Sequence, residues 1–229
     1  MYFAPSFREA AVGVLPTTKV INEDVVCIRT TLVIGGYLSC FASALFAVAL
    51  VFMDPGPEKD GLLRYISEGM ENHCGWNIVV MGTSSMAILI CHLVASTHME
   101  KGRHAAFWAL IEAAGWNIVL GVVDTGWTLH YVGLSFFLIG NIIYHWIASR
   151  EAVFGGLRYQ QTNIIAITLA LAFSGAALAS IIVGKNDRQL RACAVSLEFA
   201  MLGALTLQNM MLVNSLDRYK SIHLVFQLK

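Results

Sequence analysis

Six long apolar runs, separated by shorter polar segments, occupy most of this chain of 229 residues. A helix needs about 20 residues to cross roughly 30 Å of hydrocarbon, and each run meets that requirement. The runs lie at 30–53, 74–96, 105–123, 127–148, 162–184 and 190–213. Arg191, at the edge of the last run, is the only Lys or Arg inside these bounds, as expected because a cation in hydrocarbon is costly. The pattern predicts an all-α, polytopic membrane protein with a six-helix transmembrane bundle over residues 29–215.

The loop cations predict that both termini lie in the cytoplasm. An even number of spans places the N-terminal segment 1–28 and the short tail 216–229 on the same side. Ten of the Lys and Arg residues fall on that side and five on the other, and cytoplasmic loops carry the excess of cations. Segment 1–28 has no apolar signal-peptide core, so we expect the first span to direct targeting.

The composition narrows the classes of function. Hydrophobic residues make up 57% and charged residues 13% of the chain, whereas soluble domains carry about 25% charged residues. The formal net charge is zero, which argues against nucleic acid as a partner. No nucleophile elbow, phosphate-binding loop or HExxH motif is present in the sequence, so we do not expect an enzyme.

The sequence also predicts no metal and no cofactor. The five cysteines lack the CxxC spacing of zinc sites and disulfide frameworks. Paired haems would need four intramembrane histidines at matching depths. His92 and His145 lie at similar depths, but the last two spans contain no histidine.

Two carboxylates, Glu112 and Glu198, lie about eight residues inside their spans, or roughly 12 Å deep at 1.5 Å per residue. Such groups must be neutral, hydrated or hydrogen-bonded. The polar candidates toward the cytoplasmic half are His92, Glu112, Asn141, His145, Gln208 and Asn209. Those in the outer half or the outer loops are Ser67, Glu68, Asn77, Asn117, Asp124, His130 and Glu198. Three interpretations stay open: hydrogen bonds between helices, a proton or ion path, and a pocket for a lipid headgroup.

Two further patterns concern packing between helices. The sequence Gly-Trp-Asn-Ile-Val occurs at 75–79 and again at 115–119. This repeat is either a coincidence, because membrane spans are built from few residue types, or a sign that Asn77 and Asn117 face each other. The fifth span carries small residues at 172, 175, 176, 179 and 180, a spacing that allows close helix contacts in lipid. We expect this stripe to pack tightly against the bundle or against another subunit.

Three short motifs within residues 50–220 resemble the damage-regulated autophagy modulator (DRAM) family and its tentonin-type relatives. Ile66-Ser67-Glu68-Gly69 is similar to the loop motif before the second span of that family. His130, Gly133, Phe136 and Gly140 match its fourth-span pattern, with Leu134 in place of an alanine. Glu198-Phe199 and the exit Asp217-Arg218-Tyr219-Lys220 resemble its last span. The chain lacks the Thr-Gly and Pro-Glu of the family's loop motif.

The resemblance implies a membrane accessory factor of endolysosomal, Golgi or plasma membranes, and it carries over no catalytic residue. We therefore expect a non-enzymatic regulator or assembly subunit whose partners are membrane lipids and other membrane proteins or a second copy. An ion channel or transporter using the intramembrane Glu, His and Asn residues is one alternative. A lipid-modifying enzyme is another. The resemblance also suggests that Ser67, Glu68, His130 and Glu198 converge on one polar site.

Overall fold

The computed structural model describes residues 18–53, 65–66, 74–121, 127–151, 154, 156–183 and 187–217. Within this part of the chain every regular element is a helix. The helices are α1 (Thr18–Met53), α3 (Cys74–Asn77), η1 (Ile78–Gly82), α4 (Thr83–Ser96), α5 (Gly102–Gly121), α6 (Trp127–Arg150), α7 (Leu157–Val183) and α8 (Arg188–Asp217). α3, η1 and α4 are consecutive, and η1 is a π-helical segment inside one rod. Apart from the start of α1, the ends of the six predicted spans agree with these helices within five residues.

The helices are those of a multi-pass membrane protein by length and composition. Five segments of the described residues are long and apolar enough to cross a membrane: Thr31–Leu50, Gly75–Ser96, Thr128–Arg150, Leu157–Val183 and Arg188–Leu216. The predicted span 105–123 forms α5, a helix of 20 residues that falls outside this set. Its sequence includes Arg103, Glu112 and Asn117, which lower its mean hydropathy.

Large apolar side chains cover the outer surface of the bundle. On α1 the exposed residues Ile34, Leu38, Phe41, Leu45 and Val48 recur every three or four positions. This spacing puts them on one face of the helix, and that face points away from the other helices. A soluble protein rarely exposes such a continuous apolar stripe. The surface is therefore one suited to lipid.

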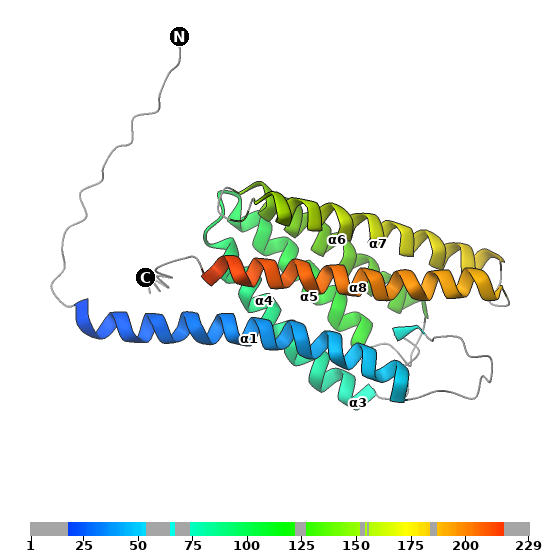
Figure 1. The fold of residues 1–229 in the computed structure, drawn as a ribbon, viewed down its shortest axis with the longest axis horizontal. Helices are drawn as coiled ribbons and strands as arrows, with labels where there is room; N and C mark the ends of the chain where they lie inside the picture. Colours follow the sequence, from blue (N-terminus) through cyan, green and yellow to red (C-terminus); the bar gives the residue numbers. More distant parts are fainter. Residues whose placement is uncertain are drawn as a thin grey trace, which may run out of the picture.

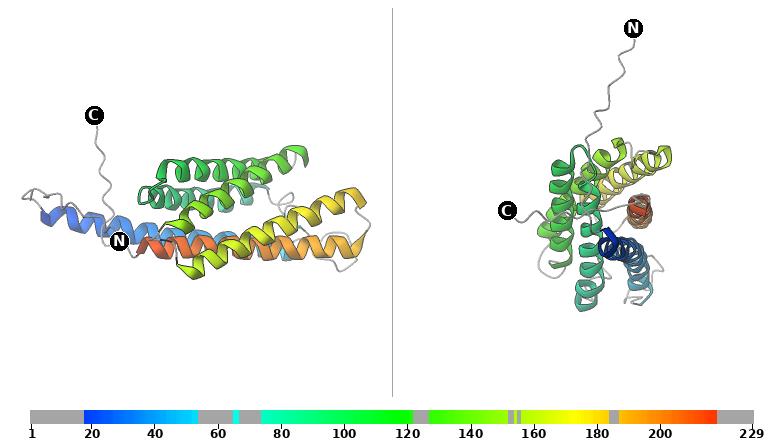
Figure 2. Two further views of the ribbon diagram at one scale, coloured as in Figure 1. Left: turned by 90° about the horizontal axis from the view of Figure 1, so that it is seen from above. Right: turned by 90° about the vertical axis from the view of Figure 1, so that its left-hand side faces the viewer.

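The helices form a ring in chain order. α1 packs against the α4 rod, α4 against α5, α5 against α6, α6 against α7, and α7 against α8, which returns to α1. α8 lies between α1 and α7, with α4 and α5 behind it (Figure 1). The end-on view in Figure 2 shows the same grouping. Consecutive helices joined by short connections are neighbours, as is usual in helical bundles.

α1 differs from the prediction at its N-terminal end. Residues 18–28 were assigned to a separate N-terminal segment, but they continue the same helix. Figure 1 shows this part of α1 running past the end of the bundle. Residues 1–17 and the tail from 218 onward lie outside the described residues.

The closest helix contact joins α5 and α6 through glycines. A Cβ on Gly140 would lie 2.5 Å from the Glu112 nitrogen and 2.9 Å from the Trp108 carbonyl oxygen. A Cβ on Gly115 would lie 2.6 Å from the Gly133 carbonyl oxygen. The two backbones therefore touch where side chains would otherwise separate them, as small residues permit in lipid.

The prediction that the small residues of the fifth span pack tightly against the bundle holds only in part, because Ala176, Ala179 and Ser180 of α7 are half-buried. On α7 a Cβ at Gly175 would meet no atom within 4 Å, and Ala172 is exposed. The buried face of α7 instead carries Ala166, Ala170 and Phe173. Spacing identifies a small-residue stripe but not the helix face that meets a neighbour.

Candidate functional site

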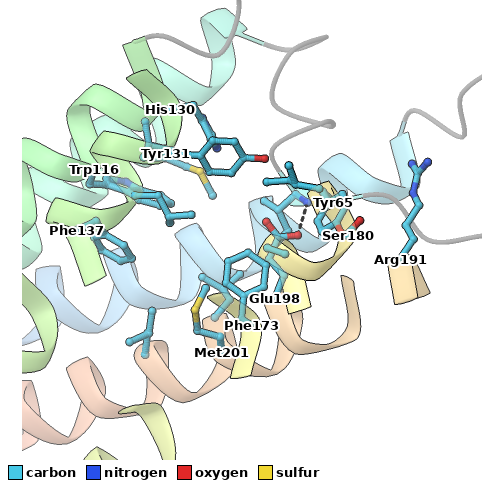
Figure 3. A pocket seen from close by; sticks show the side chains of 18 residues that line it. Tyr65, Trp116, His130, Tyr131, Phe137, Phe173, Ser180, Arg191, Glu198 and Met201 are labelled. Carbon is cyan, nitrogen blue, oxygen red and sulfur yellow. Dashed lines mark hydrogen bonds between the residues drawn. The ribbon is translucent and has the colours of Figure 1, made fainter. Parts of the chain in front are cut away.

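A cavity of about 300 Å³ lies between α5 and α6 on one side and α7 and α8 on the other. Trp116 and Phe137 form one wall, and Phe173 and Met201 form the opposite wall (Figure 3). The cavity sits at the end of the bundle where α8 begins, so it belongs to the half that the sequence assigns to the outer leaflet. Its size is at the lower end of the range for small-molecule pockets.

Polar groups gather at the outer end of this cavity. Its walls include His130 of α6, Ser180 of α7, and Arg191 and Glu198 of α8. Arg191 lies at the edge of the cavity, apart from the other labelled side chains (Figure 3). The remaining lining is mainly aromatic and aliphatic. The cavity therefore has an apolar interior and a polar end, which matches the shape of an amphiphile.

Glu198 connects α8 to the long first loop. Its Oε2 accepts a hydrogen bond from the backbone nitrogen of Ile66 at 2.9 Å, drawn as the dashed line in Figure 3. Ile66 is 6% exposed and Tyr65 lines the same cavity. A carboxylate bonded to a backbone amide forms a strong, charge-assisted hydrogen bond. This contact holds Ile66, next to Tyr65 in the cavity lining, against α8.

The π-helical segment η1 supplies another side of the cavity. It separates α3 from α4, and its Met81 is 1% exposed and lines the cavity. Thr83 donates its hydroxyl to the carbonyls of Val79 and Val80, which also accept its backbone N–H. π-helical turns occur often at functional sites.

The mouth of the cavity lies between α6 and α7. Two of the residues that line it are also exposed on the surface, Tyr131 of α6 at 38% and Ile181 of α7 at 55%. Both helices present apolar side chains outward beside this point, including Val132 and Ile182. The cavity therefore reaches the apolar surface of the bundle between α6 and α7.

A second polar group of residues lies deeper, toward the other end of the bundle. His92 Nε2 lies 2.8 Å from Asn209 Oδ1, and His92 Nδ1 lies 3.3 Å from Glu112 Oε2. Asn141 donates to Glu112 Oε1 at 2.9 Å. These four residues come from α4, α8, α5 and α6, and none is more than 8% exposed. We call them the inner network.

The inner network continues through aromatic rings to α7. Tyr144 donates to the His92 carbonyl oxygen at 3.0 Å and its ring stacks on the imidazole at 4.2 Å. His145 Nδ1 shares a hydrogen bond with the Tyr159 hydroxyl. Gln208 donates to Asn163 Oδ1 at 2.8 Å, which ties α8 to α7 at the same depth.

A smaller cavity of about 70 Å³ adjoins the inner network. Glu112, His92 and Asn209 lie on its wall, together with the hydroxyl-bearing residues Ser43, Ser85 and Thr206. It shares four lining residues with the larger cavity: Trp116, Phe137, Leu202 and Leu205. The Trp116 and Phe137 rings are 4.8 Å apart. The two cavities are therefore neighbours separated by an apolar partition.

The predicted candidates fall into three groups. His92, Glu112, Asn141 and Asn209 meet in the inner network, and His145 and Gln208 lie beside it. In the outer half, His130 and Glu198 line one cavity, while the convergence of all four outer residues that the resemblance suggests stays a prediction. Ser67, Glu68 and Asp124 lie outside the described residues.

The two asparagines of the repeated Gly-Trp-Asn-Ile-Val sequence do not face each other. Asn77 is fully buried, whereas Asn117 is exposed and donates to the carbonyl of Ala113 in its own helix. Neither lines one of the two cavities described above. The pair of facing asparagines that the repeat suggested is therefore not formed.

Sequence reasoning missed several residues of both sites. Tyr144, Tyr159 and Asn163 belong around the inner network, and Trp116 and Phe137 form the partition between the cavities. The aromatic residues were passed over because apolar rings are common in membrane spans. A signal was available for Tyr144, since a tyrosine hydroxyl within a span needs a hydrogen-bond partner.

Comparisons with protein-family models, curated proteins and solved structures found no match to this chain.

Proposed function

We propose that this protein is a non-enzymatic membrane regulator or accessory subunit that binds one membrane lipid in the outer cavity. The observation that carries the proposal is a cavity of about 300 Å³ with an apolar interior, a polar end and a mouth between α6 and α7. An acyl chain suits the interior formed by Trp116, Phe137 and Phe173. A headgroup suits the end where Arg191 and Glu198 lie.

The proposal includes six spans and cytoplasmic termini. α5 lies between α4 and α6 in the ring, and a helix of 20 residues is long enough to cross the hydrocarbon. With α5 as a span, the polar end of the cavity belongs to the outer leaflet and the inner network lies nearer the cytoplasm. The distribution of Lys and Arg among the loops supports this orientation.

The motifs similar to the DRAM family agree with an accessory role. Glu198 and Ile66, which belong to two of those motifs, are joined by a hydrogen bond at the cavity. A lipid that stabilises this contact would fix the first loop on the outer surface, where another membrane protein or a second copy could bind. By the same resemblance we assign the protein to an endolysosomal, Golgi or plasma membrane.

A photoreactive phosphatidylcholine with a clickable acyl chain, incorporated into vesicles with the purified protein, tests lipid binding. We expect cross-linked peptides to come from α6, α7 and α8 around the cavity. Ala177→Phe should lower labelling of these peptides at least fivefold, because Ala177 lines the cavity. Ala172→Phe is the matched control, since Ala172 is exposed on the same helix.

The result is interpretable only for variants that fold, so melting temperatures are measured alongside. If Ala177→Phe does not fold, Ser180→Trp fills the cavity nearer its mouth. Labelling spread evenly over the exposed faces of α1 and α7, or unaffected by a folded cavity-filling variant, would contradict the proposal. Accessibility of tags at the two termini tests the orientation separately.

A further inference from the structure

The two cavities lie end to end along the bundle. On α8 the lining of the outer cavity runs from Arg191 to Leu205, and that of the smaller cavity runs from Leu202 to Asn209. The lining residues of α5 follow the opposite order, as expected for a helix that runs in the opposite direction. The residues shared by both cavities therefore lie at one level and close the inner end of the outer cavity. They are Trp116, Phe137, Leu202 and Leu205.

This apolar partition is fixed by the close contact between α5 and α6. A Cβ on Gly115 would overlap the Phe137 nitrogen and would lie 2.8 Å from the Phe136 carbonyl carbon. Trp116 follows Gly115 in the chain, so both aromatic residues of the partition are attached to backbone that already touches the neighbouring helix. Close-packed backbone yields little to added volume. The partition is therefore a rigid end wall.

The opposite end of the outer cavity carries its polar groups and its mouth. Arg191 lies at this end, away from Trp116 and Phe137 (Figure 3). Tyr131 and Ile181, which line the cavity and are exposed, lie near the same ends of α6 and α7. A linear lipid whose headgroup occupies this end must point the methyl end of its chain at the partition.

Two measures give the number of carbons that fit. A methylene group fills roughly 30 Å³, about the volume of one liquid water, so a cavity of about 300 Å³ holds about ten. From Glu198 to Leu205, α8 advances about 10.5 Å at 1.5 Å per residue. An extended chain of ten carbons is about 11 Å long, because each bond of about 1.5 Å advances it by roughly 1.25 Å. Volume and length therefore agree.

Behind the partition the lining becomes polar. The smaller cavity has the side chains of His92, Glu112 and Asn209 on its wall, together with three hydroxyl groups. A methyl end gains nothing from contact with such groups, and it would separate them from polar partners. The partition therefore also marks the boundary between the apolar space and the inner network.

We propose that the outer cavity selects lipids by the length of one acyl chain, and that Trp116 and Phe137 set the limit at about ten to twelve carbons. The inference rests on the proposed lipid binding and adds its specificity. Moving from the bilayer into the cavity gives a chain no hydrophobic gain, because lipid tails are as apolar as the lining. Fit decides instead: a shorter chain leaves space whose lining loses contacts, and a longer chain meets the partition. Affinity therefore passes through a maximum with chain length.

Competition against the photoreactive phosphatidylcholine tests this limit, with the full chain in vesicles of dioleoylphosphatidylcholine. The competitors are phosphatidylcholines with one hexadecanoyl chain, which keeps them in the membrane, and a second chain of 6, 8, 10, 12, 14 or 16 carbons. We expect the strongest competition at 10 or 12 carbons. At 6 and at 16 carbons the mole fraction needed for half-competition should be at least threefold higher.

Trp116→Ala removes the larger ring of the partition and should join the two cavities. The smaller cavity adds about 70 Å³, room for about two methylenes at roughly 30 Å³ each, so the optimum should move to a chain at least two carbons longer. Trp146→Ala is the matched control, because Trp146 is exposed and lines neither of the two cavities. It should keep the original optimum. If Trp116→Ala does not fold, Leu202→Ala opens the same level from α8 and should shift the optimum in the same direction.

The outcomes separate this inference from the proposed function. Labelling of the cavity that Ala177→Phe abolishes, but that all competitors reduce equally, would overturn the chain-length limit and leave lipid binding intact. An unchanged optimum in a folded Trp116→Ala or Leu202→Ala variant would also overturn it. Labelling that no cavity-filling variant affects would overturn lipid binding itself, and the limit with it.

Discussion

Replacing Gly140 with alanine tests the close contact between α5 and α6 and its role in holding the inner network. The added Cβ would lie 2.5 Å from the Glu112 nitrogen, 2.8 Å from its Cα and 2.9 Å from the Trp108 carbonyl oxygen. All three are backbone atoms, so no side chain can rotate to make room. An ordinary carbon contact is about 3.5 Å or longer, which requires α5 to move by about 1 Å.

The expected cost combines two opposing effects. Adding a methyl group to a packed contact usually costs about 1–3 kcal/mol, and contacts with rigid backbone favour the upper part of that range. Alanine gains about 0.5–1 kcal/mol over glycine within a helix. The net loss of about 1–2 kcal/mol corresponds to a fall in melting temperature of about 2–8 °C for a chain of this size. The shift should also stretch the bond of 2.9 Å between Asn141 and Glu112.

Two matched glycines give the control. A Cβ on Gly175 of α7 or on Gly203 of α8 would meet no atom within 4 Å. Alanine at either position should leave the melting temperature unchanged or raise it slightly. Thermal unfolding followed by size-exclusion chromatography in detergent compares the three variants. A Gly140→Ala variant that melts at or above Gly175→Ala would refute the packing of α5 on α6 described here.

Three other perturbations follow from single contacts. Glu198→Ala should speed hydrogen exchange of the Ile66 amide, because it removes the acceptor at 2.9 Å. Glu198→Gln should speed this exchange less, and equal exchange in both variants and the original chain would contradict the contact. Glu151→Ala should lower the melting temperature by a few degrees, because Glu151 Oε1 accepts from the Glu100 nitrogen at 3.1 Å; Glu151→Gln, which keeps an acceptor, is its control. Burial lowers the pKa of His98 below its ordinary value of 6.5. Its neutral form therefore contributes stability above pH 6.5, and this stability is lost as the pH falls below that value. His98→Gln should flatten the dependence of melting temperature on pH in that range.

The helices could be predicted because length and apolarity alone define them. A run of about 20 apolar residues has few options in lipid other than a helix, since every backbone group must be satisfied within the segment. The start of α1 was missed for the same reason: residues 18–28 are polar enough to lie outside the membrane, yet they continue the helix. Apolarity marks where a span lies, not where its helix begins.

Which faces of the helices pack together was harder to predict from the sequence. A Cβ on Gly115, Gly133 or Gly140 would meet backbone atoms of the neighbouring helix, whereas one on Gly175 of α7 would meet no atom within 4 Å. The rotation of a helix about its axis decides which face is buried. With apolar side chains on every face, the sequence of a membrane helix carries little information about that rotation.

The two intramembrane carboxylates show where prediction from depth succeeds and where it fails. Depth along antiparallel helices correctly placed His92, Glu112, Asn141 and Asn209 at one level. To predict the contacts among these four residues, the order of the helices around the ring must also be known. The short connections between helices imply only that α4, α5 and α6 are neighbours. The approach of α8, which brings Asn209 to His92, depends on closure of the ring. Glu198 lies about as far from the start of its span as Glu112, but toward the opposite end of the bundle, and it accepts a hydrogen bond from the backbone of Ile66. The role of a buried carboxylate is therefore determined by which donor the neighbouring segment presents at its level, which is the Asn141 side chain for Glu112 and the Ile66 backbone amide for Glu198.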